Sequence, residues 1–162
     1  MTSIYLLLGG NIGNRLFYLQ EAKKQIEENV GRIVAQSSIY ETAPWGVENQ
    51  PDFLNQAVEL DTEQNPEELL KNILSIELAL GRERHQKWYA RTIDIDILLY
   101  HKLLISSKDL IVPHLRLPYR KFGLIPLAEI APTFIHPQTN KTIRVMLDEC
   151  TDTLEVKLFE NR

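Results

Sequence analysis

The sequence predicts an α+β fold with a ferredoxin-like βαββαβ core, whose mainly antiparallel sheet carries both helices on one face. Two observations support this prediction. Segments rich in apolar, β-branched and aromatic residues alternate with amphipathic segments that begin at helix-capping residues. Their order over roughly the first hundred residues is strand, helix, strand, strand, helix, strand. Shorter elements follow, so the core is expected to have C-terminal additions.

The first predicted strand and helix come from the segment SIYLLLGGNIGNRLF. Its apolar run is typical of a buried strand, and Gly9-Gly10-Asn11 is expected to end that strand. Asn14 is a candidate N-cap, and Gly31 is the expected stop of the helix that follows. The apolar side chains on one arc of this helix are Leu19, Ala22, Ile26 and Val30.

The next elements are two strands and a second helix. Residues 32–42 and 53–62 are rich in β-branched and aromatic residues, which predicts two strands joined by the turn-rich segment 43–52. The second helix should begin with Asn65 as N-cap and Pro66 at its first position, and Gly81 follows its apolar residues.

Glu77 is an anomaly in this second helix. It lies inside the apolar arc and in the last turn, where the helix dipole disfavours an anion. One interpretation is a boundary residue whose carboxylate reaches water, and the other is an acceptor for the donors of a ligand.

The last core strand is expected in RTIDIDILLY, residues 91–100. Alternation places Asp94 and Asp96 side by side on one face, where two carboxylates roughly 6 to 7 Å apart repel by about 2 to 3 kcal/mol at a dielectric near 20. Either this face meets water, or the pair holds a divalent metal such as Mg²⁺ together with substrate phosphates.

The C-terminal third predicts only short elements. Residues 102–105 are expected to pair with the preceding strand, residues 121–130 and 142–150 to form short helices, and residues 154–159 to form a last strand.

Basic charge is concentrated immediately before the two aspartates. Residues 82–91 hold Arg82, Arg84, Lys87 and Arg91 against a single acidic residue. Phosphate-binding cations beside metal-binding carboxylates are typical of a nucleotide polyphosphate site, and a solvated loop that neutralises the aspartates is the alternative. The chain has neither a Walker A sequence nor a GxGxxG sequence, so a P-loop or Rossmann site is not expected.

Other residues are candidates for binding a flat ring or a phosphate. Aromatic side chains can stack on a heterocycle while an amide hydrogen-bonds to its edge, although each ring alone is more typical of core packing than of ligand contact. His114 is a candidate phosphate donor, and Arg120 belongs to a second, weaker basic cluster. The ring-binding candidates are Trp45, Phe53, Asn55 and Phe122.

Composition limits the class of protein. The 162 residues suffice for one domain, residues 1–162, and the net charge of −4 argues against a nucleic-acid binder or an anionic-membrane binder. A single cysteine suits a reducing compartment, and the start of the chain is typical of a strand rather than a signal peptide. We therefore expect a cytoplasmic protein without a membrane span. A monomer is expected as well, although nothing in the composition bears on the oligomeric state.

Several motifs in collinear order resemble one known family. They are LGGNIGNR, SSIYETAPWG, QPDFLNQAV, IELALGRER, RTIDIDILLY, VPH and PLAEIAP, which cover roughly residues 4–135. Together they resemble 6-hydroxymethyl-7,8-dihydropterin pyrophosphokinase of folate biosynthesis. The resemblance implies a ferredoxin-like core, two Mg²⁺ ions, and transfer of pyrophosphate from ATP to the hydroxymethyl group of the pterin with release of AMP.

The resemblance also implies roles for individual residues. Asp94 and Asp96 would hold the two Mg²⁺ ions, with Arg82 and Arg91 as further catalytic residues. The ATP-binding residues would be Glu77, Arg82, Arg84, Arg91, Ile97, His114 and Arg120. The pterin-binding residues would be Thr42, Pro44, Trp45, Phe53, Asn55 and Phe122. Trp88-Tyr89-Ala90-Arg91-Thr92 departs from the family's usual Trp-Gly-Pro-Arg-Thr.

Two hypotheses from other classes remain open at this point. A ferredoxin-like module that binds a metabolite without turnover would use the same core, since that core hosts many functions. Another Mg²⁺-dependent nucleotide enzyme, such as a nucleotidyltransferase, would share the acidic pair. The aromatic residues and Asn55 favour the pterin.

Overall fold

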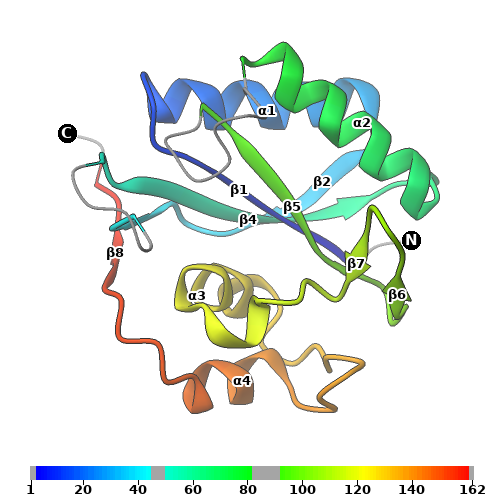
Figure 1. Cartoon of the computed structure of the whole chain (residues 1–162), viewed down its shortest axis with the longest axis vertical. Coiled ribbons are helices and arrows are strands. Elements are labelled where there is room, and N and C mark those ends of the chain that lie inside the picture. Colours follow the sequence, from blue (N-terminus) through cyan, green and yellow to red (C-terminus); the bar gives the residue numbers. More distant parts are fainter. Residues whose placement is uncertain (1–2, 45–49, 82–91, 161–162) are drawn as a thin grey trace.

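An antiparallel sheet forms the centre of the structure, a computed structural model that describes residues 3–44, 50–81 and 92–160 (Figure 1). Within these residues the strand order is β5-β1-β4-β3-β8, and β2 also pairs with β4. The strands are β1 (Ile4–Gly10), β2 (Arg32–Gln36), β3 (Tyr40–Thr42), β4 (Phe53–Asp61), β5 (Asp94–Tyr100) and β8 (Val156–Leu158).

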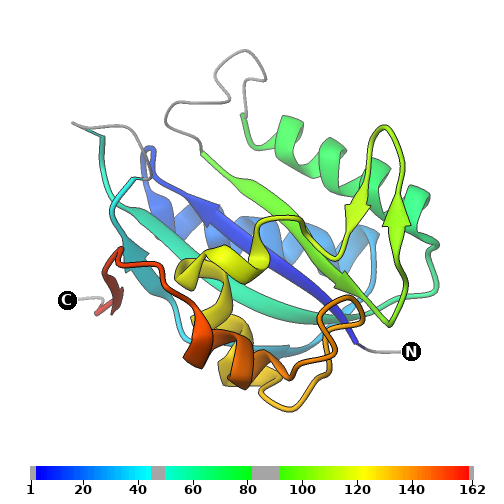
Figure 2. The ribbon, with the colours of Figure 1, turned by 60° about the horizontal axis from the view of Figure 1, so that its bottom comes forward.

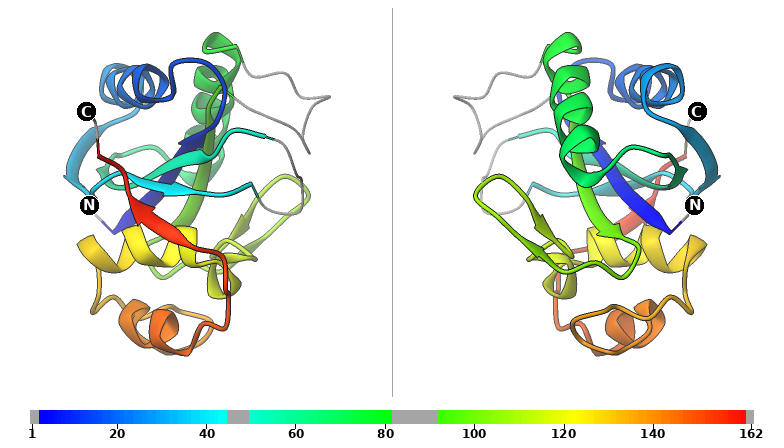
Figure 3. Two further views of the ribbon diagram at one scale, coloured as in Figure 1. Left: turned by 90° about the vertical axis from the view of Figure 1, so that its left-hand side faces the viewer. Right: turned by 90° about the vertical axis from the view of Figure 1, so that its right-hand side faces the viewer.

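Helices cover both faces of the sheet (Figure 3). α1 (Arg15–Asn29) and α2 (Pro66–Ala79) lie on one face, and α3 (Lys121–Ile130) and α4 (Ile143–Glu149) lie on the other. The core strands β1, β4 and β5 with the β2–β3 segment, and the helices α1 and α2, confirm the predicted ferredoxin-like core. The C-terminal helices turn this core into three layers.

Local signals correctly predicted where α1 and α2 begin. The Asn14 side chain accepts a hydrogen bond from the Phe17 N–H at 3.0 Å, and the Asn65 side chain accepts one from the Glu68 N–H at 2.9 Å. These bonds satisfy amide groups that have no partner within the helix.

Each face of the sheet has its own apolar core. Leu6 and Leu8 of β1 pack with the core under α1 and α2, whereas Tyr5 and Leu7 pack with the core under α3 and α4. All of β1 is buried as a result. Its continuous apolar sequence therefore reflects a strand that is covered on both sides.

Two predicted boundaries differ from the structure. Gly9 and Gly10 do not end β1 but belong to it, paired with Asn55 and Leu54 of β4. The predicted strand over residues 32–42 is divided into β2 and β3, because Ser37 leaves the regular pattern: its hydroxyl accepts a hydrogen bond from the Ala57 N–H at 3.0 Å.

The predictions for the C-terminal third are confirmed except for one pairing. Residues 102–105 do not extend the sheet beside β5. Instead, β6 (Ile105–Ser106) pairs with β7 (Ile111–Val112) in a separate hairpin, visible on the right of Figure 2. The helices α3 and α4 and the last strand β8 lie within their predicted ranges. Among the described residues, no helix is both long and apolar enough to span a bilayer.

His136 lies between α3 and α4 and provides a test of this layer. Its side chain is 1% exposed, and its Nδ1 atom accepts hydrogen bonds from the Gln138 and Thr139 N–H groups, both at 3.2 Å. Burial lowers the pKa of this imidazole below its ordinary value of 6.5. The neutral form is therefore the form that fits the fold.

We expect His136 to make the fold sensitive to acid. Since the folded pKa is lowered, the unfolded chain takes up a proton at higher pH, so stability is retained above pH 6.5 and decreases as the pH falls below it. The loss is at most about 1.4 kcal/mol per pH unit. Urea denaturation between about pH 7.5 and pH 5.5 should show a smaller decrease for His136→Gln than for the wild type. Equal decreases in the free energy of unfolding for His136→Gln and the wild type would show that His136 is not the source of the acid sensitivity.

Candidate active site

A row of residues crosses the sheet on the face toward α3. Asp94 of β5 pairs with Gly9 of β1, Gly9 pairs with Asn55 of β4, and Asn55 pairs with Tyr40 of β3. Directly paired residues of antiparallel strands point to the same face. The hydroxyl of Tyr40 donates to Glu129 of α3, which identifies this face as the one beneath α3.

Gly9 is the residue that lets this row come together. A Cβ atom at Gly9 would lie 2.3 Å from Oδ1 of Asn55 and 3.1 Å from the Leu54 carbonyl oxygen. The Asn55 side chain, which is 6% exposed, therefore uses space that any other residue at this position would fill. This role is missing from the sequence-based prediction, where the glycine was expected only to end the strand.

Asp94 and Asp96 lie on this same face, as the alternation predicted. Asp96 pairs with Leu7, whose side chain belongs to the α3 side of the sheet. Both aspartates are partly exposed, and the Asp96 side chain retains 36% of its exposure. Two carboxylates are thus held on one strand with access to solvent.

His114 faces these carboxylates. Its backbone N–H donates to the Leu98 carbonyl at 2.9 Å, and its Nδ1 atom accepts from the Arg116 N–H at 3.2 Å. Its Nε2 atom lies 4.0 Å from Oδ1 of Asp96. Burial lowers the pKa of His114, with Asp94 opposing the shift and Arg116 and Arg120 adding to it. The geometry makes His114 a neutral donor through Nε2.

The first turn of α3 carries Phe122 next to this region. The Arg120 guanidinium carbon lies 5.9 Å from the centroid of the Phe122 ring, within cation–π range. Gly123 lies over β1, since a Cβ atom there would be 3.7 Å from Cδ2 of Leu7. Because Leu7 is the strand partner of Asp96, the turn of Phe122 lies beside the strand pair that carries the aspartates.

Phe53 and Thr42 extend the site toward the other edge of the sheet. They are strand partners on the same face as Asn55. Thr42 is 2% exposed, and within the described part of the chain its buried hydroxyl has no hydrogen-bond partner. Pro44 is partly exposed two residues after β3 ends. An orphaned hydroxyl beside an aromatic ring and an amide suits a ligand with polar edges.

Glu77 and Ile97 are not brought together with the aspartates. Ile97 is 5% exposed in the core under α1 and α2, on the opposite face of β5 from Asp96. Glu77 does not reach water as one interpretation held, because it is 2% exposed and its Oε2 atom accepts from the Ile95 N–H at 2.7 Å. This carboxylate links α2 to the outer edge of β5.

We expect Glu77→Ala to destabilise the fold by about 1 to 3 kcal/mol, since it removes the acceptor of the Ile95 N–H. Urea denaturation would measure the free energy of unfolding. The neighbouring substitution Leu78→Ala is a matched control, because Leu78 is 53% exposed on the same helix and should change stability by less than about 0.5 kcal/mol. Equal effects of the two substitutions would contradict a linking role.

Four predicted site residues, Trp45, Arg82, Arg84 and Arg91, lie outside the described residues. In the chain, each of these segments is followed within a few residues by a strand that carries a described site residue, since β4 begins at Phe53 and β5 begins at Asp94.

Arg15 and Asn11 hold the described flanks of segment 45–49. Arg15 donates to Oε2 of Glu41 at 2.6 Å and to the Asp52 carbonyl at 2.9 Å. Asn11 donates to the Pro51 carbonyl at 2.9 Å. These contacts were not predicted from the sequence. The polar residues of the LGGNIGNR motif, which include Asn11 and Arg15, were the feature that could have indicated them.

The donor set fits magnesium better than zinc. No group of three or more His, Cys, Asp or Glu side chains in the described ranges is arranged to hold a metal ion. Mg²⁺ is commonly bound by one or two carboxylates, with substrate phosphates and water completing its shell. Asp94 and Asp96, partly exposed on one strand, provide such a pair.

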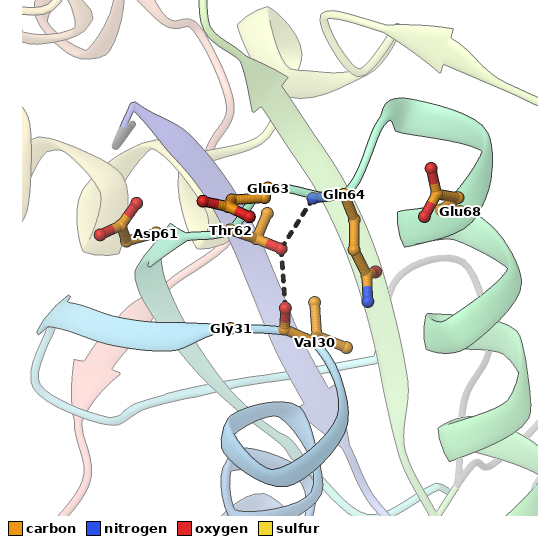
Figure 4. Close-up of a pocket in the computed structure, with 7 residues that line it drawn as sticks. All are labelled: Val30, Gly31, Asp61, Thr62, Glu63, Gln64 and Glu68. Atoms are coloured by element: carbon orange, nitrogen blue, oxygen red, sulfur yellow. Dashed lines mark hydrogen bonds between the residues drawn. The ribbon is translucent and has the colours of Figure 1, made fainter.

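A separate pocket lies at the other end of β4, next to Asp61 (Figure 4). The nine residues of β4 place it about 26 Å along the strand from Phe53. Asp61, Glu63 and Glu68 line it, and the Thr62 hydroxyl inside it donates to the Val30 carbonyl at 2.7 Å. Three carboxylates would repel a polyphosphate, so this pocket does not suit a nucleotide.

Comparison with known proteins points to one family. Residues 5–132 match the family model described as 7,8-dihydro-6-hydroxymethylpterin-pyrophosphokinase. The chain is 47% identical over 136 residues to the 2-amino-4-hydroxy-6-hydroxymethyldihydropteridine pyrophosphokinase of Methylorubrum extorquens, covering 83% of this chain and 86% of that protein. It is 42% identical to the enzyme of the same name from Aquifex aeolicus, covering 93% and 94% of the two chains.

Solved structures share the fold. The chain resembles the wild-type Plasmodium falciparum HPPK-DHPS structure with pteroate, with a TM-score of 0.75 and 18% identity. The likeness covers 90% of this chain and 44% of that chain. The chain therefore spans less than half of that longer protein, and the likeness bears on the fold alone.

Proposed function

The chain belongs to the 7,8-dihydro-6-hydroxymethylpterin-pyrophosphokinase family, and from this premise we propose that the α3 side of its sheet is the active site. The activity is ATP-dependent transfer of a pyrophosphoryl group to 6-hydroxymethyl-7,8-dihydropterin, with release of AMP, in folate biosynthesis. The hydroxymethyl oxygen forms a bond to the β-phosphorus of ATP. The bond between that phosphorus and the oxygen bridging to the α-phosphate breaks, and the hydroxyl proton is lost.

The pterin is assigned to the space between β4 and α3. Phe53 and Phe122 stack on the two faces of the ring, while the Asn55 amide hydrogen-bonds to its edge. Asn55 is well suited to this task because Gly9 and the adjacent strands hold it in a buried position. Thr42, Pro44 and Trp45 complete the pocket on the β3 side.

The triphosphate is assigned to the region between the aspartates and the basic residues. Asp94 and Asp96 would hold two Mg²⁺ ions, and the chemistry that Mg²⁺ would supply there is neutralisation of phosphate charge and polarisation of an oxygen ligand. Arg82, Arg84, Arg91 and Arg120 neutralise the remaining charge, and His114 donates from Nε2. The partly exposed pair Asp94 and Asp96, on the same face as Asn55, is the observation that carries this assignment.

The adenosine is assigned to the outer edge of β5. β5 is an edge strand, and the Ile95 N–H on that edge bonds to Glu77 rather than to another strand. Ile97, two residues further along, presents its backbone in the same direction. Ile97 would therefore contact the nucleotide through its backbone, and Glu77 would support that edge.

The protein acts as a cytoplasmic monomer, with residues 1–162 as one pyrophosphokinase domain.

An ATP turnover assay tests the function. The protein is incubated with ATP and Mg²⁺, with and without 6-hydroxymethyl-7,8-dihydropterin, and AMP is separated from ADP by chromatography. AMP that appears only with the pterin is the expected result. Formation of ADP in place of AMP would contradict the proposed function. Formation of AMP at the same rate with and without the pterin would also contradict it.

A further inference from the structure

The helix that presents Phe122 begins without a cap of its own. Arg120 is the N-cap residue of α3, and its side chain makes no capping hydrogen bond. The backbone carbonyl of Arg120 accepts from the N–H groups of Gly123 and Leu124 at 3.2 and 3.1 Å. The Lys121 N–H at the start of the helix has no acceptor within the helix.

Asp152 supplies the missing acceptor from a distant part of the chain. Its Oδ2 atom accepts from the Lys121 N–H at 3.0 Å, and its Oδ1 atom accepts from the Leu154 N–H at 3.0 Å. The positive end of the helix dipole also stabilises a negatively charged carboxylate at this place. One half-buried side chain thus joins the first turn of α3 to the C-terminal segment.

The C-terminal segment also contacts the opposite side of the proposed pterin pocket. After Asp152 the chain runs to β8, which pairs with β3, and Val156 is the partner of Thr42. In Figures 1 and 2 this segment runs from α4 to the edge of the sheet at β3. It therefore connects the turn of Phe122 with the strand of Thr42.

We propose that Asp152 is a positioning residue, which sets pterin affinity by holding the first turn of α3, with Phe122, against the C-terminal segment. The proposal rests on the proposed function, because it needs Phe122 in the pterin pocket. Asp152 lies beyond residues 5–132, the part of the chain that matches the family model. The Asp152 carboxylate acts through the turn and does not touch the substrate.

Removal of the cap should lower the fraction of molecules whose first turn is ordered for binding. The apparent dissociation constant rises as that fraction falls. The usual contribution of a helix cap sets an upper limit of about 30-fold, and within that limit we expect Asp152→Ala to raise the dissociation constant of the pterin severalfold. Asp152→Asn keeps one acceptor oxygen and should cause a smaller rise.

The test needs a matched control that loses a cap without touching Phe122. Thr142 caps α4, where its hydroxyl accepts from the Val145 N–H at 3.2 Å, and α4 carries no proposed substrate residue. Pterin titration and thermal denaturation are measured for the wild type, Asp152→Asn, Asp152→Ala and Thr142→Ala. Amide hydrogen exchange of residues 121–124 reports on the turn itself.

The expected result is weaker pterin binding and faster exchange at residues 121–124 in the Asp152 variants, with a raised KM for the pterin and nearly unchanged kcat. Thr142→Ala should lower the melting temperature without either change. An Asp152→Ala protein that melts earlier but binds pterin as the wild type does would overturn the proposal, as would equal loss of affinity in Thr142→Ala. A wild-type protein that binds no pterin would instead contradict the proposed function itself, and this inference with it.

Discussion

Asp96→Ala is expected to reduce AMP formation at least about 10³-fold while the fold is retained. The Asp96 side chain is 36% exposed at the α3 side of β5, so its removal leaves no large cavity. Removal also relieves the repulsion between Asp96 and Asp94, which favours unchanged or slightly higher stability. Initial rates of AMP formation at saturating ATP and pterin, with circular dichroism of the same samples, measure both effects.

Asp109→Ala is the control for this experiment. Asp109 is an exposed carboxylate between β6 and β7 and is none of the proposed site residues, so its loss should leave turnover unchanged. If Asp96→Ala turned over ATP and pterin at the wild-type rate, the assignment of the metal ions to this strand would be wrong.

Phe122→Ala is expected to weaken pterin binding about 10- to 100-fold and ATP binding much less. Loss of one stacking ring typically costs about 1 to 3 kcal/mol per base, and the pterin is a comparable flat heterocycle. Equilibrium titrations with each ligand separately, well below the melting temperature of the variant, measure the two affinities.

Tyr119→Ala provides the matched aromatic control. Tyr119 ends the short 3-10 helix η2 (Leu117–Tyr119) just before α3 and is 69% exposed. Its removal takes away a ring of similar size without altering the proposed pocket, so both affinities should stay at wild-type values. Equal weakening of pterin and ATP by Phe122→Ala would contradict the stacking assignment.

The parts of the fold that depend on local sequence could be predicted. Asn14 and Asn65 cap helices through residues three positions away, and the side-by-side position of Asp94 and Asp96 follows from strand alternation alone. The division of strand 32–42 could not be predicted in this way. It depends on the bond between the Ser37 hydroxyl and Ala57, which lies 20 residues away.

The candidate site shows the same limit. That Asp94 and Asn55 share a face with only Gly9 between them depends on the pairing register of β1 with two other strands. The anomaly at Glu77 was a correct signal of a special position, but its partner, the Ile95 N–H, is known only from the packing of α2 on β5. The capping role of Asp152 could not be predicted from local sequence, because the helix that it caps, α3, begins at Lys121, 31 residues earlier in the chain.

A crystal structure with a non-hydrolysable ATP analogue, a pterin and Mn²⁺ in place of Mg²⁺ would test the central claim most directly. Anomalous scattering locates the metal. We predict metal density between Asp94 and Asp96, with the pterin ring between Phe53 and Phe122 on the α3 side of the sheet. Metal and ligands found elsewhere, for example in the acidic pocket beside Asp61, would contradict the account.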